Sequence, residues 1–423
     1  AGTTLFSITI GGVPYKFTKN EAFTYVSGKM MNFGIKVDKQ TGSGAYKLTL
    51  VSESITPWEN DLVSHDATTK EYVVINSTKG HLKEAIAAAN KDYTKIKNLK
   101  ITGEISAQDF YFMRDSMENL AALNLKEVII RGGEQRLTGG AQGVYPHNDY
   151  EIPYEALRGK KSLNLLVLPD KLTKIGIAAF ADDQNITGSL IIPEGVTEIE
   201  VGAFYDCRSM NGTLSLPSTL KYLGRGIDLW WYGGVFTYCG FTSELILPNN
   251  LECIAGNNTF AGCEGLHGEL RFPEKLTEIS DGAFNGCKSL TGSITIPQGV
   301  HKLPTSVFQF CDNLNGTLTL PDGITSIGYN CFQGCALKGE LKLPKNLTVI
   351  ADEVFNGCDF SGELVLPKTI RSIGKRAFAN NWRLMGIVEF PEGLQSIGAG
   401  AFANCRMIEG LVFPEFGKHS GRK

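Results

Sequence analysis

The stretch LTEISDGAFNGCKSLTGSITIP, residues 276–297, decides the fold because its pattern returns along most of the chain. Prolines equivalent to Pro297 recur at spacings of 23 to 25 residues, with one spacing of 31, and phenylalanines equivalent to Phe284 keep the same period. These phenylalanines are Phe180, Phe204, Phe236, Phe260, Phe284, Phe308, Phe332, Phe355, Phe378 and Phe402. Self-similarity at a period of about 20–50 residues is the signature of a repeat architecture. We therefore expect a solenoid.

Each repeat can be converted into local structure. Ile294 and Ile296 alternate with polar residues, which predicts a strand with one buried face. Pro297 has no N–H group and should end that strand in every repeat. The segment Ala283–Leu290 predicts a single helical or 3₁₀ turn that buries its apolar side chains. Gly292 recurs where the chain enters the strand and needs a residue without a Cβ atom.

One repeat cannot fold alone. Its seven or eight buried side chains stabilise it by roughly 10–20 kcal/mol, whereas ordering its backbone and side chains costs about 1.5 kcal/mol per residue, which is more in total. Stacked neighbours must supply the remaining burial. We expect a right-handed, β-rich solenoid with short helical or 3₁₀ turns and about eleven rungs, a rung being one turn of the solenoid.

The chain divides into three parts by pattern. Residues 1–75 should form a small all-β domain, because three segments alternate apolar and polar residues between polar turns: Leu5–Ile10, Asn32–Val37 and Ala45–Val51. Residues 76–150 should cap the solenoid with two helices, a strand and a loop: His81–Asn90, Ser106–Leu120, Lys126–Ile130 and 131–150. Residues 151–416 should form the solenoid itself.

The repeat unit, as in residues 323–335, resembles the leucine-rich repeats of the BspA-type (bacterial surface antigen A) family over roughly residues 80–415. This resemblance implies a secreted surface protein that adheres to host proteins and other cells. Residues 45–61, with Ser54-Ile-Thr-Pro-Trp58, are similar to the closing strand of fimbrillin-like proteins. Together the two resemblances imply a Bacteroidetes-type protein of the outer-membrane surface that carries a lipid anchor upstream of this chain.

Composition excludes several classes of function. The net charge is −3, which gives no basic surface for nucleic acid. No run of 18 apolar residues occurs, so no transmembrane span is expected. The sequence has no motif typical of a catalytic, cofactor-binding or metal-binding site. We expect a protein that is not an enzyme and has no cofactor or metal.

Eight of the ten cysteines follow a repeat phenylalanine by three residues. Equivalent Cβ atoms on stacked strands stand ~4.8 Å apart, more than the ~3.8 Å usual in a disulfide. We therefore favour buried free thiols that act as small apolar residues over a disulfide framework. Cys331 replaces a repeat alanine and should also be buried. Cys253 occupies the outward position of Glu278, so it is predicted to be the one reactive thiol.

The long rung contains an insertion at residues 225–234 that carries Trp230, Trp231 and Tyr232. Insertions in solenoids map to loops and often to binding faces. These aromatic residues could stack on sugars, anchor a protein interface, or fold back to protect an edge. Trp382 is a weaker candidate in another outward position.

The outward face of the repeat strands, which we call the strand face, is the second candidate site. Its polar ladder could be a ligand footprint or simply a solvated sheet, and the candidate binding residues on it are Glu269, Arg271, Thr295, Thr319, Lys342 and Glu363.

Two functions remain open from the sequence. The first is a surface interaction or adhesion protein that binds host extracellular or bacterial surface proteins through the solenoid. The alternative is a glycan-binding surface module that uses the aromatic insertion. Replacing Trp230, Trp231 and Tyr232 with alanine should abolish glycan binding under the alternative and should spare protein binding to the strand face.

Overall fold

The computed structural model describes residues 3–10, 13–19, 29–39, 46–57, 71–136, 144–226, 233–406 and 410–412. The chain forms two compact units, Ala1–Lys70 and Glu71–Lys423. The first contains two antiparallel hairpins, one of β1 (Thr3–Ile10) with β2 (Val13–Lys19) and one of β3 (Lys29–Lys39) with β4 (Tyr46–Pro57). Strand formation at the three predicted segments is confirmed, and β2 is an additional strand. The resemblance of residues 45–61 to fimbrillin-like proteins stays a prediction.

The second unit begins with a cap in which helices cover a parallel sheet. Its strands, in the spatial order β11, β7, β6, β5, are Leu165–Val167, Ala122–Ile130, Asn98–Ile105 and Val73–Ser77. Its helices are α2 (Leu82–Ala88), the 3₁₀ turn η2 (Tyr93–Lys95) and α3 (Ala107–Ser116). The buried Asp109 carboxylate accepts hydrogen bonds from the backbone N–H of Leu82 and of Ser106, so it satisfies the starts of both helices.

The expected loop at 131–150 is corrected in part. Antiparallel strands β8 (Gly133–Arg136) and β9 (Val144–His147) form a hairpin within it. The prediction of a loop relied on the polar and glycine-rich composition of this segment. Composition does not indicate whether two segments pair through their backbones. Residues 137–143 lie outside the described residues.

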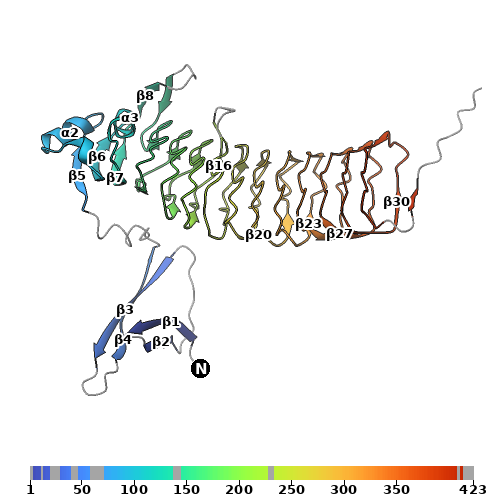
Figure 1. The fold of residues 1–423 in the computed structure, drawn as a ribbon, viewed down its shortest axis with the longest axis horizontal. Coiled ribbons are helices and arrows are strands. Elements are labelled where there is room, and N and C mark those ends of the chain that lie inside the picture. Colours follow the sequence, from blue (N-terminus) through green and yellow to red (C-terminus); the bar gives the residue numbers. More distant parts are fainter. Residues whose placement is uncertain are drawn as a thin grey trace, which may run out of the picture. The chain divides into compact units, whose positions relative to one another are not determined.

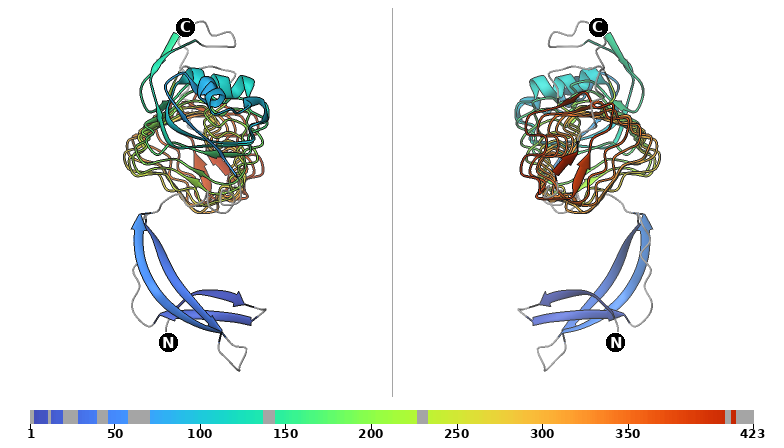
Figure 2. Two further views of the ribbon diagram at one scale, coloured as in Figure 1. Left: turned by 90° about the vertical axis from the view of Figure 1, so that its left-hand side faces the viewer. Right: turned by 90° about the vertical axis from the view of Figure 1, so that its right-hand side faces the viewer.

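The solenoid carries a first row of short parallel strands, formed by the L-x-x-I segment of each rung (Figure 1). These strands are β10 (Glu151–Ile152), β12 (Lys174–Ile175), β14 (Glu198–Ile199), β16 (Tyr222–Leu223), β17 (Cys253–Ile254), β19 (Glu278–Ile279), β22 (Lys302–Leu303), β24 (Ser326–Ile327), β26 (Val349–Ile350), β28 (Ser372–Ile373) and β31 (Ser396–Ile397). Viewed from the ends, the rungs of the solenoid overlie one another (Figure 2).

A second row comes from the segment before each repeat proline, and its pairing is interrupted. Its strands are β13 (Leu190–Ile191), β15 (Leu214–Ser215), β18 (Gly268–Glu269), β20 (Leu290–Thr291), β21 (Ile294–Thr295), β23 (Leu318–Thr319), β25 (Lys338–Gly339), β27 (Asp359–Gly362), β29 (Arg383–Leu384), β30 (Ile387–Glu389) and β32 (Gly410–Val412). The predicted alternation is confirmed, since Ile294 and Ile296 are buried and Thr295 is exposed.

The ten repeat phenylalanines form one continuous interior stack. Ring centroids of successive members, from Phe180 to Phe402, lie 5.2–5.7 Å apart and the rings are nearly parallel. The predicted alignment of Phe260, Phe284 and Phe308 is therefore confirmed. The solenoid has about 13 turns rather than about eleven. The two additional turns correspond to the parallel strands β6 and β7, which stack on β11 of the first rung without carrying the Phe-Cys pattern.

The segment from Ala283 to Leu290 consists of hydrogen-bonded turns rather than a helix. The backbone N–H of Cys287 donates to the Phe284 carbonyl, and the N–H of Leu290 donates to the Cys287 carbonyl. Each of these hydrogen bonds joins residues that are three apart in the sequence, and the bonds do not continue into a regular helix. At Gly292, φ is +84° and an added Cβ would lie 2.8 Å from Glu269 Cγ, so the predicted need for glycine is confirmed there.

The repeat cysteines are free thiols with a specific structural task. Each repeat Sγ–H donates to the carbonyl oxygen of the phenylalanine one rung earlier, at 2.9–3.2 Å. Asn381 replaces cysteine in one rung and its Nδ2 donates to the Phe355 carbonyl instead. This column therefore needs a small side chain with a donor, because the buried carbonyl it meets would otherwise lose a partner.

The prediction that Cys253 is the reactive thiol is wrong. Only 1% of Cys253 is exposed, and its Sγ lies 3.0 Å from Glu278 Oε2 in the next rung. Burial, followed by the nearby Glu278 carboxylate, raises the pKa of Cys253 to about 12. Among the ten cysteines, Cys405 alone is partly exposed, and burial raises its pKa to about 11.

Labelling of the folded protein with iodoacetamide at pH 8 should therefore modify Cys405 first and should leave Cys253 unmodified until the protein unfolds. The thiolate is the reactive species, so a thiol that is buried and has a raised pKa reacts slowly. Peptide mass spectrometry at successive times would give the order of modification. Early modification of Cys253 would contradict the burial described here.

Candidate functional site

The six binding residues predicted on the strand face lie on consecutive rungs. Glu269 and Arg271 form an exposed ion pair at 2.7 Å. Thr295 and Thr319 are exposed register partners on β21 and β23. Lys342 and Glu363 occupy the next two rungs and are also exposed. All six side chains point to solvent, and of these six only Lys342 and Glu363 line the hollows described next.

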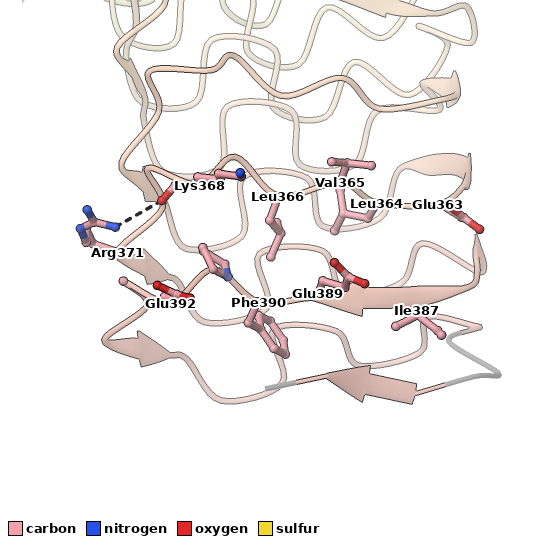
Figure 3. A pocket seen from close by; sticks show the side chains of 12 residues that line it. Glu363, Leu364, Val365, Leu366, Lys368, Arg371, Ile387, Glu389, Phe390 and Glu392 are labelled. Atoms are coloured by element: carbon pink, nitrogen blue, oxygen red, sulfur yellow. Dashed lines mark hydrogen bonds between the residues drawn. The ribbon is translucent and has the colours of Figure 1, made fainter. Parts of the chain in front are cut away.

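A hollow lies between the rung of residues 363–371 and the rung of residues 387–393, and we call it the C-terminal hollow (Figure 3). Its volume is about 1120 Å³. A second hollow of about 410 Å³ adjoins it, contains Lys342, and shares Val365 and Lys368 with it. The two hollows together make the strand face concave over three rungs.

The backbone ladder on this face is interrupted at several rungs, and one of these interruptions lies at the C-terminal hollow. Where the ladder is formed, as at Ile294 and Ile296, the backbone N–H groups donate to carbonyls of the next rung at 2.9 and 3.0 Å. Across the described residues, no backbone hydrogen bond joins 363–366 to 387–390. Among the described residues the same bonds are also absent between 341–343 and 363–366, so the missing pairing is a general feature of this face and does not by itself distinguish the hollow.

The floor of the C-terminal hollow is apolar. Leu366 and Phe390 lie at its base and are almost completely buried, whereas 71% of Val365 and 42% of Ile387 are exposed. Three further large apolar side chains are exposed on the same rungs or the next one: Trp382, Met385 and Val412. Exposed apolar residues that gather in one region mark binding surfaces more often than isolated ones do.

The two ends of the C-terminal hollow differ in charge. Lys368 and Arg371 lie at one end with Glu392, while Glu363 lies at the other end and Glu389 lies between them (Figure 3). Arg371 Nη1 donates only to backbone carbonyls, those of Lys368 and Ile370, at 3.3 and 3.5 Å. Within the described residues, neither Lys368 nor Arg371 has a carboxylate within 4.0 Å. Their positive charge is therefore available to a bound partner.

The other sequence candidates lie elsewhere. Trp382 is 63% exposed and shares a rung with Ile387, but it does not line the C-terminal hollow. Trp230, Trp231 and Tyr232 lie outside the described residues. Lys368, Arg371, Ile387 and Phe390 were missed from the sequence. The available signal was the replacement of polar strand-face residues by Val365 and Ile387 in two successive rungs.

Two further properties bear on the chemistry. In the parts of the chain with described side chains, no cluster of three His, Cys, Asp or Glu residues could hold a metal ion. No helix among the described residues is long and apolar enough to cross a membrane.

Comparisons with known proteins concern the repeats. The family model for the BspA type leucine rich repeat region matches in 6 copies, over residues 150–227, 232–361 and 316–421. A comparison with curated protein sequences found no match.

Solved structures give weaker likenesses. A leucine rich cell surface protein from Faecalibacterium prausnitzii is 18% identical with a TM-score of 0.41, and the match covers 93% of this chain and 95% of that one. A leucine-rich repeat protein from Bacteroides ovatus is 20% identical with a TM-score of 0.41, covering 89% and 92%. The pneumococcal vaccine antigen PcpA is 16% identical with a TM-score of 0.36, covering 74% and 70%.

The repeat family is established by the sequence match together with the stacked rungs. The matched segments span nearly all of residues 150–421, where the phenylalanine and cysteine columns run in register. The chain belongs to the BspA-type leucine-rich-repeat family.

Proposed function

We propose that this chain is a cell-surface interaction protein that binds partner proteins through the C-terminal hollow. The observation that carries the proposal is the coincidence of exposed apolar side chains and unpaired cations in one concave region. Membership of the BspA-type family supports a surface role. A location on the outer membrane, a lipid anchor upstream, and host or bacterial surface proteins as partners belong to the same proposal. Nothing in the hollow calls for enzymatic chemistry.

The lining favours an extended protein segment as the occupant. Val365 and Ile387 offer apolar contact along the length of the hollow, as a segment in extended conformation requires. Lys368 and Arg371 at one end suit an acidic side chain, and Glu363 at the other end suits a basic one. The occupant we expect is therefore an apolar segment flanked by opposite charges.

Selection of a phage-displayed random peptide library on the full chain tests this proposal. Wild-type protein should enrich apolar peptides with an acidic residue at one end and a basic residue at the other. The double variant Val365→Asp/Ile387→Asp should bind the enriched peptides roughly tenfold or more weakly, because both apolar contacts are lost. Val365 is 71% exposed and Ile387 is 42% exposed, so the melting temperature should fall only slightly.

The matched control is Thr295→Asp/Thr319→Asp, which adds the same charges to the same face outside the hollow. Peptide affinity should survive in this control. Equal losses in the two double variants would mean that charge on the strand face, and not the C-terminal hollow, governs binding. Failure of the wild-type protein to enrich any such peptide would exclude the proposed occupant.

A further inference from the structure

Another hollow with different chemistry lies beside the long rung, far along the sequence from the C-terminal hollow. It is lined by Tyr205, Gly233, Thr237, Tyr238, Asn258, Ala261, Gly262, Glu264, Asn285 and Gly286, and its volume is about 490 Å³. That volume falls within the range of about 300–1,000 Å³ typical of small-ligand sites. We call it the tyrosine hollow. Gly233, which lies near the end of the insertion at residues 225–234, forms part of its lining.

The backbone holds one of these tyrosines on the surface at a cost. The second residue after each repeat phenylalanine adopts a left-handed conformation, and this position is usually glycine, asparagine or aspartate. Tyr238 and Phe310 are the exceptions, with φ of +61° and +59°. A bulky residue at positive φ is unusual because its Cβ crowds the backbone. Both aromatic side chains are nevertheless exposed, by 49% and 47%.

The two tyrosine rings pack against glycines, which have no side chain to displace them. A Cβ at Gly262 would lie 2.5 Å from Tyr238 Cδ1, and a Cβ at Gly233 would lie 2.5 Å from the Tyr205 ring. Both rings therefore lie directly against backbone. The two rings meet edge to face, with centroids 6.3 Å apart. Gly286 extends the floor beyond them, and an added Cβ there would meet nothing closer than 3.8 Å.

The rim of the tyrosine hollow supplies hydrogen-bonding groups. Asn285 Nδ2 donates to Gln309 Oε1 at 3.3 Å, which leaves the side-chain Oδ1 of Asn285 and the second N–H of its amide for a ligand. The exposed amide of Asn258 lies on the same rim. Thr237 Oγ1 donates to the Asn258 carbonyl and can still accept a hydrogen bond.

Charges around the tyrosine hollow cancel in pairs. Glu264 accepts from Lys288 Nζ at 2.7 Å, and Asp206 accepts from Arg208 Nε. The Arg208 guanidinium also lies 5.6 Å from the centre of the Tyr238 ring. Among the described residues around this hollow no excess of cations is present to attract an anionic ligand, since each of these charges has a partner of opposite sign. The chemistry on offer is aromatic surface together with neutral donors and acceptors.

We propose that the tyrosine hollow binds a neutral saccharide. A sugar ring has an apolar C–H face that packs on aromatic side chains, and hydroxyl groups that exchange hydrogen bonds with amides and carboxylates. Tyr205 and Tyr238 supply the aromatic surface, and Asn258 and Asn285 supply the amides. This site is independent of the C-terminal hollow and of its peptide ligands.

An array of neutral oligosaccharides and their sialylated or sulfated counterparts, probed with the labelled full chain, tests the proposal. The chain should retain neutral glycans and should not prefer the anionic counterparts. Calorimetry with the best neutral glycan should then show Tyr238→Gly binding roughly tenfold or more weakly than wild type. Glycine relieves the left-handed backbone at this position, so the variant should fold normally.

Phe310→Gly is the matched control, because it makes the same change in the same backbone conformation outside the tyrosine hollow. Its glycan affinity should equal that of wild type. Gly286→Asn should abolish binding because its side chain fills the floor of the tyrosine hollow. The variant should fold, since asparagine occupies the equivalent position in other rungs, as at Asn380.

Three results would overturn the proposal. The first is that no neutral glycan is retained on the array. The second is that anionic counterparts bind more tightly than neutral glycans. The third is that Tyr238→Gly binds the glycan as tightly as wild type does. If replacement of Trp230, Trp231 and Tyr232 with alanine then abolishes binding, glycan recognition belongs to the insertion.

Discussion

Replacing Phe284 with alanine should lower the free energy of unfolding by about 3–5 kcal/mol. The Phe284 ring is fully buried in the middle of the phenylalanine stack, with neighbouring centroids at 5.4 Å (Phe260) and 5.6 Å (Phe308). Phe272 also meets it edge to face at 5.7 Å. Rigid rungs on both sides cannot collapse into the space, so the loss of contact is added to the lost burial.

The position of Phe284 should also change the manner of unfolding. In a solenoid each rung is stabilised mainly by its two neighbours, so a weak rung in the middle uncouples the two halves. Urea unfolding of Phe284→Ala, followed by circular dichroism, should show a lower midpoint and a broader transition than that of wild type. The measurement needs no assumption about ligand binding.

Phe402→Ala is the matched control for this prediction. Phe402 belongs to the same stack, 5.3 Å from Phe378, but it is partly exposed. The same substitution there should cost clearly less, since less buried surface is lost. Equal losses at the two positions would show that the stack does not gain stability from burial between rungs.

Replacing Asp183 with asparagine should raise the free energy of unfolding at pH 8 by about 1–3 kcal/mol. Asp183 is fully buried in the cysteine column. One of its oxygens accepts from the Lys160 backbone N–H, whereas Oδ2 has no hydrogen-bond partner among the described residues. Asn381, in the same column, shows that an amide there can donate to a carbonyl of the rung before.

The effect of Asp183 should depend on pH with a defined sign. Burial raises the pKa of Asp183 well above its usual value of 3.8, and the Lys160 backbone N–H opposes this only in part. The folded state therefore holds the Asp183 proton at pH values where the unfolded state has released it. Wild-type stability should fall as the pH rises from about 4 towards the folded-state pKa, and this dependence should be weaker in Asp183→Asn.

Asp182→Asn provides the control for the pH measurement. Asp182 is adjacent in sequence but partly exposed, and it pairs with Arg158 at 3.2 Å. Its replacement should give no stabilisation, because water already solvates the carboxylate. Denaturation of all three proteins between pH 5 and pH 8 gives the comparison. A wild-type stability that rises with pH over this range, unchanged in Asp183→Asn, would contradict the assignment.

Much of the solenoid could be predicted from the sequence because its columns repeat at nearly constant spacing. Phe284, Cys287 and Ile294 recur in register, and a residue that recurs at the same point of each turn must meet its equivalent in the next turn. Burial of the cysteines and exposure of the strand-face residues followed from the same rule. The prediction from the repeat pattern was wrong where the chain departs from the repeat, as in the hairpin of β8 and β9.

Cys253 shows why pattern alone misleads. Its register partners are Tyr222 and Glu278, both at least partly exposed, so an outward position was a reasonable inference. The cysteine is nevertheless covered, and the side chains of Glu278 and Arg225 interact with it. Arg225 begins the insertion that only this rung contains. Burial at this point depends on an irregular neighbour, which periodicity cannot represent.

The sequence by itself determined the repeat, its interior columns and the family, since each follows from the identity and spacing of side chains along the chain. The tertiary structure alone decided where the surface becomes concave. Val365 and Ile387 belong to different rungs, and only the stacking of those rungs brings both side chains to the lining of one hollow. Tyr205 and Tyr238 likewise meet only because glycines let both rings lie against neighbouring turns. Such sites depend on distances between rungs, which stacking sets and local sequence does not.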